Sequence, residues 1–343
     1  MSVLTALLFL LLFVVLLSAC IGALPISMNE LWAIVKYQVG MGEMSGFSSQ
    51  QRAVLMNIRL PRIILGVLIG AALATSGAVI QGLFRNPLSD PGLIGISSGA
   101  SFFAVLMIVL EASFFKAITG IFGYYALSVA AFVGACLTTW IVYRLAMKDG
   151  KADVTLLLLV GISINALTGS FTGLLTYVAT DEQLRNITFW SLGSLGGASW
   201  QTVIGVLPFT VLPVCLLPLL AKPLNALILG EAQAALMGIK VYRVKQLIVI
   251  LATIAVGGSV AVAGMIGFIG LVTPHIIRIA FGADNHLVLP ASALLGAAIL
   301  STADLIARTL AAPQELPIGI LTALLGTPVF LYIILADRRK MRL

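Results

Sequence analysis

Charged residues are scarce in this sequence. Only 10% of its 343 residues are Asp, Glu, Lys or Arg, whereas 60% are hydrophobic, and the mean hydropathy is +1.11. Soluble domains carry about 25% charged residues, so the composition excludes an ordinary soluble domain and predicts an all-α polytopic membrane protein. A helix needs about 20 apolar residues to cross a bilayer, which leaves room for roughly ten spans joined by short loops.

Sequence motifs for catalysis and nucleotide binding are also missing. The chain contains no GxxxxGK[ST] phosphate loop, no HExxH and no GxSxG, and His275 and His286 stand apart from any metal-ligand spacing. We therefore expect no catalytic residue, no metal site and no cofactor, and ATP hydrolysis only in a partner. Cys20, Cys136 and Cys215 each lie in an apolar run, which predicts free thiols rather than a disulfide framework.

Acidic residues are nearly absent from the apolar runs. Asp304 is the one clear acid inside a predicted span, and it lies four residues before Arg308 on the same helix. This spacing predicts a structural Asp304–Arg308 pair rather than a proton relay, although ionisable groups at bilayer depth are often functional. A secondary transporter or channel that works alone remains the alternative from another functional class.

Positive charge is unevenly distributed over the loops. The net charge of +7 comes from lysines and arginines that we expect to set topology in the membrane, so a nucleic-acid partner is not expected. If the ambiguous segment 264–282 crosses the membrane, Arg85, the loops 144–151 and 222–245, and the basic C-terminal cluster that ends at Arg342 all fall on one side. This arrangement predicts ten spans with both termini in the cytoplasm.

The first apolar stretch covers residues 1–24 and allows two interpretations. Its segment Leu17-Ser18-Ala19-Cys20 has the form of a bacterial lipoprotein cleavage box, but the basic region that starts a signal peptide is missing. We expect a first transmembrane helix here, and a cleaved signal is the alternative. Residues 25–56 are more polar and predict one or two short helices.

Residues 57–101 organise the rest of the chain. Gly66, Gly70, Ala74 and Gly77 recur at helical spacing along the span at about 61–84, which predicts a face that another helix can approach closely. Two prolines soon afterwards predict a tight polar hairpin. Part of this pattern recurs later in the chain. At a constant offset, the residues Gly257, Ala261, Gly264 and Pro274 match Gly70, Ala74, Gly77 and Pro87. This pattern predicts an inverted repeat with halves at about 57–178 and 246–337 inside a single domain, 1–343.

Two charged regions are candidates for contacts with other molecules. The amphipathic segment 221–245 predicts two short helices broken near Gly230 and Gly238, which either lie on membrane lipid or contact a cytoplasmic protein. Arg59, Arg62 and Arg308 lie at the opposite side of the predicted membrane. They are either solvated or bound to lipid headgroups, or they form a docking ring for acidic groups of an extracytoplasmic partner, because arginine holds carboxylates bidentately.

Four motifs resemble signatures of the FecCD-type permeases, the membrane subunits of ABC importers for ferric siderophores, haem and cobalamin. They are RLPR at 59–62, GAALATSGAVIQGLFRNPLSDPGLIG at 70–95, GFIGLVTPHIIR at 267–278 and ELPIGILTALLGTPVF at 315–330. The resemblance implies a type II ABC importer permease fold in the bacterial inner membrane, with a second permease subunit, most simply in a homodimer. It also implies two copies of an ATP-binding ABC subunit and a periplasmic or lipid-anchored solute-binding protein, which together drive alternating access.

The resemblance also assigns roles to individual positions. It implies three sets of site residues: Arg59, Arg62 and Arg308 for binding-protein docking; Asn86, Leu88, Val154 and Thr155 for the cytoplasmic gate; and Glu231, Ala234 and Gly238 for ATPase coupling. Many relatives have a small polar residue where this chain has Val154. The stretch DEQLRNITFWSLGSLGG at 181–197 is similar to haem permeases and shares LR-x-x-x-(F/Y)W with the cobalamin permease, so haem is favoured, with ferric siderophores and cobalamin as alternatives.

Overall fold

The computed structural model describes residues 2–41, 43, 45–110, 122–148, 151–311 and 314–340. These residues are helical apart from loops and one short β-hairpin, in which Met147 pairs with Ala152. Within this described part of the chain, seven helices are long and apolar enough to cross a membrane, and three shorter apolar helices accompany them. The all-α membrane class is therefore confirmed, and the count of ten crossings stays a prediction. Arg342, from the basic C-terminal cluster, lies outside the described residues.

The elements of the described chain follow in this order: α1 Val3–Cys20, α2 Met28–Gln38, α3 Ser49–Val54, η1 Leu55–Arg59, α4 Leu60–Phe84, η2 Pro91–Ile94, α5 Ile96–Leu110, η4 Gly123–Tyr125, α7 Ala126–Leu145, β1 Met147–Lys148, β2 Lys151–Ala152, α8 Val154–Tyr177, α9 Asp181–Leu192, α10 Trp200–Leu216, η5 Leu217–Leu220, α11 Ala221–Ile228, α12 Glu231–Leu236, α13 Val241–Ala263, α14 Ile269–Phe281, α15 Asn285–Leu310 and α16 Ile318–Lys340.

Polar side chains mark where many of these helices begin. Ser27, Ser48 and Thr180 each form a capping box, in which the side chain accepts from the third backbone N–H of the helix and a Glu or Gln at that position accepts in return. Asp153 caps α8 and Asp284 caps α15 through single carboxylate oxygens. These caps place the short polar helices α2, α3 and α9 between the long apolar ones.

Helix α4 is the last part of a longer continuous helix that also includes an unusual turn. Residues 49–84 form one helix, interrupted by the π-turn η1. Pro61 has no backbone N–H and cannot donate to the preceding turn. Immediately before it, the N–H of Leu60 bonds to the carbonyl of Leu55, one residue further back than in an α-helix. The wider π-turn thus accommodates Pro61 within the helix. It also turns Arg59 to a different side than an uninterrupted α-helix would.

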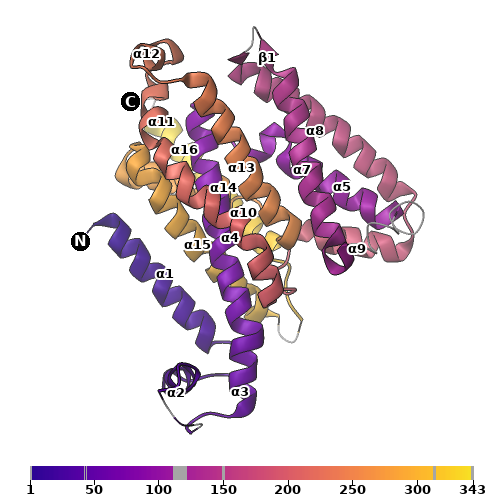
Figure 1. Cartoon of the computed structure of the whole chain (residues 1–343), viewed down its shortest axis with the longest axis vertical. Helices are drawn as coiled ribbons and strands as arrows, with labels where there is room; N and C mark the ends of the chain where they lie inside the picture. Colours follow the sequence, from indigo (N-terminus) through magenta and orange to yellow (C-terminus); the bar gives the residue numbers. More distant parts are fainter. Residues whose placement is uncertain are drawn as a thin grey trace.

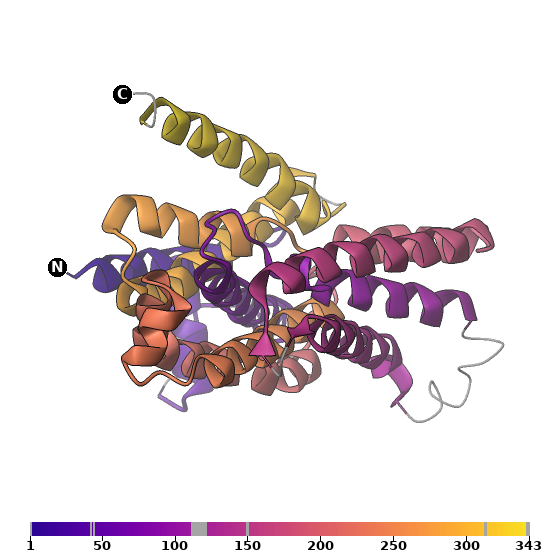
Figure 2. The ribbon, with the colours of Figure 1, turned by 90° about the horizontal axis from the view of Figure 1, so that it is seen from above.

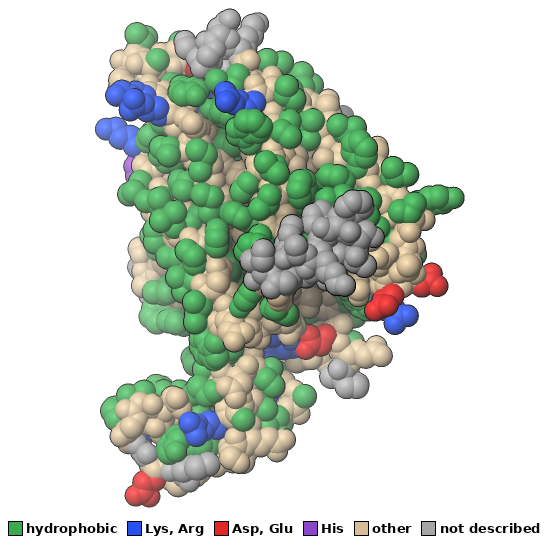
Figure 3. All heavy atoms as spheres, turned by 45° about the vertical axis from the view of Figure 1, so that its right-hand side comes forward, with side chains coloured by type: hydrophobic (Ala, Val, Ile, Leu, Met, Phe, Trp, Pro, Cys, Tyr) green, Lys and Arg blue, Asp and Glu red, His purple; other side chains and the backbone are tan. Residues whose placement is uncertain are grey.

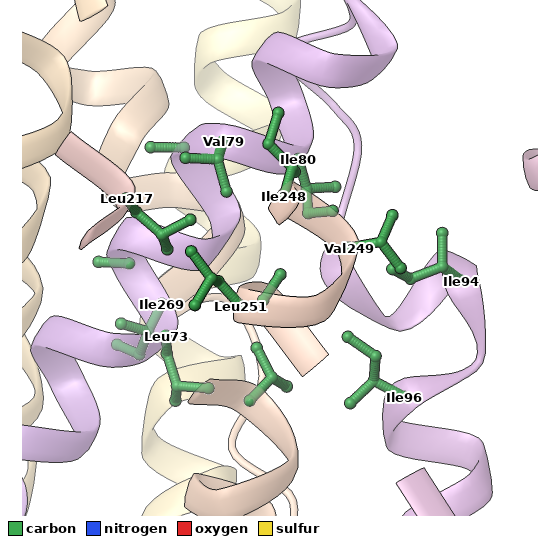
Figure 4. Close-up of a cluster of buried hydrophobic side chains, with 14 of the residues drawn as sticks. Leu73, Val79, Ile80, Ile94, Ile96, Leu217, Ile248, Val249, Leu251 and Ile269 are labelled. Carbon is green, nitrogen blue, oxygen red and sulfur yellow. The ribbon is translucent and has the colours of Figure 1, made fainter. Parts of the chain in front are cut away.

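Helix α4 lies at the centre of the bundle and packs against α10, α13, α14 and α15 (Figure 1). A Cβ atom placed on Gly70 would lie 2.5 Å from the carbonyl oxygen of Gly296 in α15, and one on Gly77 would overlap the carbonyl of Gly270 in α14. The predicted small-residue packing face is confirmed. Figure 4 shows the aliphatic core beside this face, where Leu73 and Ile80 of α4 meet Ile248 and Leu251 of α13.

Three predictions about local structure concern the first apolar stretch, the breaks near Gly230 and Gly238, and the inverted repeat. The segment at 3–20 forms α1, which lies along α15 as a first apolar helix. The breaks near Gly230 and Gly238 are confirmed, because α12 lies between them. Figure 1 shows α4 and α13 running in opposite directions, as the predicted inverted repeat requires, but α13 ends before Gly264 whereas α4 continues past Gly77.

The ambiguous segment 264–282 forms a break followed by a short helix. Gly264 has a positive φ of 70° and ends α13, and α14 then spans 13 residues. A perpendicular crossing needs about 20 residues, so α14 alone is too short for one, and the crossing of 264–282 stays a prediction. His275 lies in the interior of α14, where it is buried.

The surface of the molecule is consistent with a membrane setting. On the face shown in Figure 3, hydrophobic side chains cover the middle of the molecule and charged side chains gather toward its two ends. Figure 2 shows α16 lying at one margin of the bundle, where it diverges from the other helices. Leu324, Leu331 and Tyr332 of this helix are exposed. We refer below to the end that carries α2 and α3 as the lower end and to the end that carries α12 as the upper end.

Candidate functional site

Two arginines from neighbouring helices hold the C-terminal end of α1 at the lower end of the molecule. Arg59 donates to the carbonyl oxygens of Ala19 at 2.7 Å and Cys20 at 3.1 Å. Arg308, near the end of α15, donates to the carbonyl oxygen of Ser18 and, at 2.8 Å, to its hydroxyl oxygen. The last carbonyls of a helix have no partner within it, so these guanidinium groups cap α1 and fix it against α4 and α15.

Arg62 forms a buried ion pair beside this cap. Its Nε lies 2.9 Å from Oδ1 and 3.1 Å from Oδ2 of Asp304, and its Nη2 lies 2.9 Å from Oδ1. Its Nη1 donates to Oε1 of Glu315 at 2.7 Å. The side chain of Asp304 is only 3% exposed, whereas that of Glu315 is 45% exposed. A buried carboxylate thus anchors Arg62 on one side, and a partly exposed one reaches it from the surface.

The predicted pair between Asp304 and Arg308 is therefore wrong. The two side chains do lie on one face of α15, but Asp304 accepts from Arg62 of α4, and Arg308 extends to Ser18 of α1. An i,i+4 pair on a helix contributes only about 0.2–0.5 kcal/mol, so a bidentate donor on an adjacent helix and the unpaired carbonyls of α1 outcompete it.

The structure brings Arg59, Arg62 and Arg308, here called the arginine cluster, into one region, as expected. Arg59 and Arg62 are not solvated, because they are only 3% and 7% exposed, and Arg308 is half-buried. Their role in docking stays a prediction. Glu315 was not predicted as a member of this site. Its position in the ELPIGIL motif gave no sign that it would meet an arginine on a distant helix.

At the upper end, the turn after α4 carries Asn86 and Leu88. Arg85 ends α4 in the left-handed conformation, with φ 50°, and its N–H bonds back to the carbonyl of Gln81. The side-chain oxygen of Asn86 accepts from the N–H of Leu88 at 2.9 Å, and Leu88 is 42% exposed. Asn86 thus shapes the turn, and Leu88 is presented at its surface.

The other two predicted gate residues begin α8. Asp153 caps this helix through the N–H groups of Thr155 at 2.8 Å and Leu156 at 3.0 Å, with Val154 half-buried and Thr155 exposed. Further along α8, the side-chain amide of Asn165 donates to the carbonyl of Gly92 in η2 at 3.0 Å. This amide, which the sequence did not single out, ties α8 to the segment that follows the Asn86 turn.

The predicted coupling residues are all part of α12 or its ends. Glu231 is the first residue of α12, and Ala234 is fully buried on its inner side. Gly238 follows the helix with φ 81°, and the N–H of Ile239 bonds to the carbonyl of Ala234 at 3.1 Å. This is the usual termination by a left-handed glycine. On the outer side, Leu236 is 90% exposed, so α12 presents an apolar tip.

At the upper end, Glu231 contacts positively charged residues from two other segments. Its carboxylate accepts from Lys245 of α13 at 2.7 Å and lies 3.7 Å from Nη2 of Arg85. Lys245 also donates to the carbonyl oxygen of Ala152, two residues before Val154, at 2.8 Å. We call Arg85, Glu231 and Lys245 the Glu231 cluster. Lys245 appeared in the sequence only as one of several lysines in a basic segment.

A second polar contact holds α11 beside the start of α15. The side-chain amide of Asn225 donates to Oδ1 of Asp284 at 2.7 Å, and its oxygen accepts from the backbone N–H of Asn285 at 2.9 Å. Asp284 also accepts from the backbone N–H of His286 at 3.0 Å. This backbone bond, followed by the bond from Asn225, lowers the pKa of Asp284 to about 2, so the carboxylate is charged at neutral pH.

Between the two ends lies a cavity of about 580 Å³. Its wall comes from α4, η2, α5, α9, α13, α14, α16 and the loops beside them, and it is mostly apolar, with Asp90, Ser97 and Ser191 among the few polar residues. Asp90 accepts from the N–H of Gly92 at 2.7 Å and shapes the loop before η2. A cavity of this volume with a mostly apolar wall suits a small organic molecule.

Comparison with known proteins identifies close relatives over nearly the whole chain. The model of the FecCD transport family matches residues 10–336. A hemin transport system permease protein of Yersinia pestis, HmuU, is 45% identical over 324 residues, which cover 94% of this chain and 92% of that protein. A cobalamin import system permease protein of Halobacterium salinarum, BtuC, is 40% identical and covers 85% of this chain and 76% of its own.

Solved structures show the same fold. A metal-chelate type ABC transporter described in an inward-facing conformation matches with a TM-score of 0.84 and 31% identity, covering 97% of this chain and 98% of its own. PsaBC of Streptococcus pneumoniae, solved with an antibody fragment, matches with a TM-score of 0.52 and 17% identity over 79% of this chain and 89% of its own. The second likeness concerns the fold alone.

Proposed function

We propose a function from one premise: this chain belongs to the FecCD transport family. It is a multi-pass inner-membrane permease subunit of an ABC importer for haem, a siderophore or cobalamin. The finer proposal is that haem is its cargo and that ATP hydrolysis in partner subunits drives the two ends to open in turn. The 45% identity to a hemin permease over 94% of the chain is the observation that most supports haem.

An external energy source is supported by the way Asp304 is used. A proton-coupled transporter needs a protonatable group that gains and loses its proton at membrane depth. Asp304 is instead engaged by three close contacts from Arg62, so its carboxylate forms a structural ion pair between α4 and α15. We therefore propose two copies of an ATP-binding ABC subunit that bind against α12, with Glu231, Ala234 and Gly238 at the contact. Both chain termini then lie in the cytoplasm.

A second copy of this chain is proposed as the partner within the membrane. Helices α8 and α16 present exposed apolar side chains, among them Leu167, Phe171 and Leu174 of α8 and Leu324 and Tyr332 of α16. Such faces suit close helix packing. A homodimer with ten spans in each subunit would enclose a shared path between Asn86, Leu88, Val154 and Thr155 of each copy.

The test of this function is uptake into proteoliposomes that contain the permease with an ATP-binding ABC subunit and a solute-binding protein from the same organism. We expect haem to accumulate only when ATP and both partners are present, and to exceed cobalamin and ferric siderophores presented through the same binding protein. Uptake that continues without the ATPase would instead support the secondary transporter or channel. Preference for cobalamin or a siderophore would keep the importer and change its cargo.

Docking of the solute-binding protein on the arginine cluster is also proposed. Arg59 and Arg62 are poor test positions, because replacing either with Glu would break buried contacts and change the fold as well as the surface. Glu315 is better placed, since its carboxylate is 45% exposed and already contacts Arg62 at 2.7 Å. If acidic groups of the partner bind here, Glu315 competes with them for the guanidinium.

We therefore expect Glu315→Gln to strengthen docking of the binding protein by up to about fivefold, equivalent to about 1 kcal/mol. Surface plasmon resonance on permease in nanodiscs measures this change. The gain should shrink as the salt concentration rises, because exposed charges are screened. Weaker docking of the variant at low salt would contradict an acidic partner surface at this site.

A further inference from the structure

Lys245 is a buried cation that the predicted gate and coupling sets do not include. The residue is 4% exposed, although lysine is almost never fully buried unless it is paired. Its Nζ lies 2.7 Å from the carboxylate of Glu231 and 2.8 Å from the carbonyl oxygen of Ala152. One ammonium group therefore joins α12 to the hairpin that precedes α8.

The second strand of the hairpin leads directly into α8. Ala152 pairs with Met147 across the two strands, and the N–H of Asp153 bonds to the carbonyl of Ala146 at 3.1 Å. Asp153 is the cap of α8, and Val154 and Thr155 follow it directly. A displacement of the Ala152 carbonyl is thus transmitted to the first turn of α8 with few rotatable bonds between them.

The same carboxylate also faces the second gate segment. Arg85 lies 3.7 Å from Oε1 of Glu231 and immediately precedes Asn86. The Glu231 side chain is 41% exposed and that of Arg85 40%, whereas the side chain of Lys245 is 5% exposed. The pair with Lys245 is therefore the firm contact, and the pair with Arg85 is open to solvent and easily broken.

A cavity under α12 leaves space for this helix to move. It has a volume of about 500 Å³ and is lined by residues that include Ala152, Glu231, Tyr242 and Lys245. Ala234 anchors the inner side of α12 in the core. A push on the exposed tip at Leu236 would thus tilt α12 about Ala234 and move its first residue, Glu231.

We propose that Lys245 is a positioning residue that transmits movement of α12 to both gate segments through the carboxylate of Glu231. The proposal rests on the function proposed above, because it assigns the movement to an ATPase that binds α12. Lys245 holds Glu231 to the α8 hairpin in every state, and the weaker Arg85 contact forms or breaks as α12 tilts. A purely structural ammonium would stabilise the fold without affecting how ATP hydrolysis is used.

The test compares uptake with ATP hydrolysis in the reconstituted importer. For Lys245→Met we expect the ATP hydrolysed per cargo molecule imported to rise about tenfold, within the range seen for coupling residues, while hydrolysis itself continues. Glu231→Gln, at a half-exposed position, should show the same defect, and the double variant should be no worse than either one. Arg144→Met removes an exposed cation from the end of α7 and is the matched control.

The outcomes separate this proposal from the function on which it rests. Wild-type protein without ATP-driven uptake would overturn the proposed function. The role of Lys245 would be overturned if the wild type imports cargo and Lys245→Met hydrolyses as much ATP per imported cargo molecule as the wild type does. An equal reduction of uptake and hydrolysis in the variant would have the same meaning. An independent measurement uses spin labels at Leu236 and Leu88 in a variant without the three native cysteines. Pulsed EPR should give a broader distance distribution after Lys245→Met, and an unchanged distribution would count against the link.

Discussion

Replacing Gly77 with alanine is expected to prevent α4 and α14 from packing and to leave little folded permease. The added Cβ would overlap the carbonyl carbon and oxygen of Gly270, which belong to the backbone and cannot rotate away. Overpacking in a well-packed core costs about 1–3 kcal/mol and occasionally more, and a backbone overlap places Gly77 at the upper end. The measurement is the thermal unfolding midpoint in detergent, together with the fraction of monodisperse protein after solubilisation.

Gly169→Ala and Gly205→Ala are the matched controls. Both glycines lie in long helices, and a Cβ on either would have no other atom within 4 Å. Alanine favours a helix by about 0.5–1 kcal/mol over glycine, so these variants should be as stable as the original protein or slightly more so. Equal loss at Gly77 and at the controls would mean that glycine flexibility, and not the close approach of α4 to α14, is required.

The second large effect is expected for Arg62→Met. This change leaves the carboxylate of Asp304 buried, with its side chain 3% exposed and its three contacts from Arg62 removed. Breaking a buried pair from one side costs about 3–5 kcal/mol, because an uncompensated charge remains in a medium of low dielectric constant. The unfolding midpoint in detergent should fall accordingly.

Two further variants identify the cause of this loss. Arg62→Met combined with Asp304→Leu replaces the buried pair with apolar side chains, which is often neutral or stabilising, and should recover most of the stability. Glu315→Gln removes the partly exposed acid and should change the stability by less than about 1 kcal/mol. A double variant as unstable as Arg62→Met alone would show that shape or the neighbouring α1 cap, and not the buried charge, explains the loss.

The sequence alone predicted the class of the fold and most of its local breaks. Hydropathy and the scarcity of charge are properties of the composition, and a bilayer admits few other solutions for such a chain. The breaks at Gly230 and Gly238 and the turn after α4 depend on residues within a few positions of one another. The small-residue face of α4 follows from helical spacing, so the sequence could place Gly70 and Gly77 on it without knowing their partners.

The partners of the charged residues were decided only by the tertiary structure. Arg62 and Asp304 are 242 positions apart, and Arg308 and Ser18 are 290 apart, so no local pattern connects them. From the sequence, Arg308 was the expected partner of Asp304. An i,i+4 pair is weak, however, and stronger contacts replace it when the packing of α1, α4 and α15 brings other partners close. Lys245 is the same case at the other end, because its burial against Glu231 and Ala152 exists only once three separate segments have met.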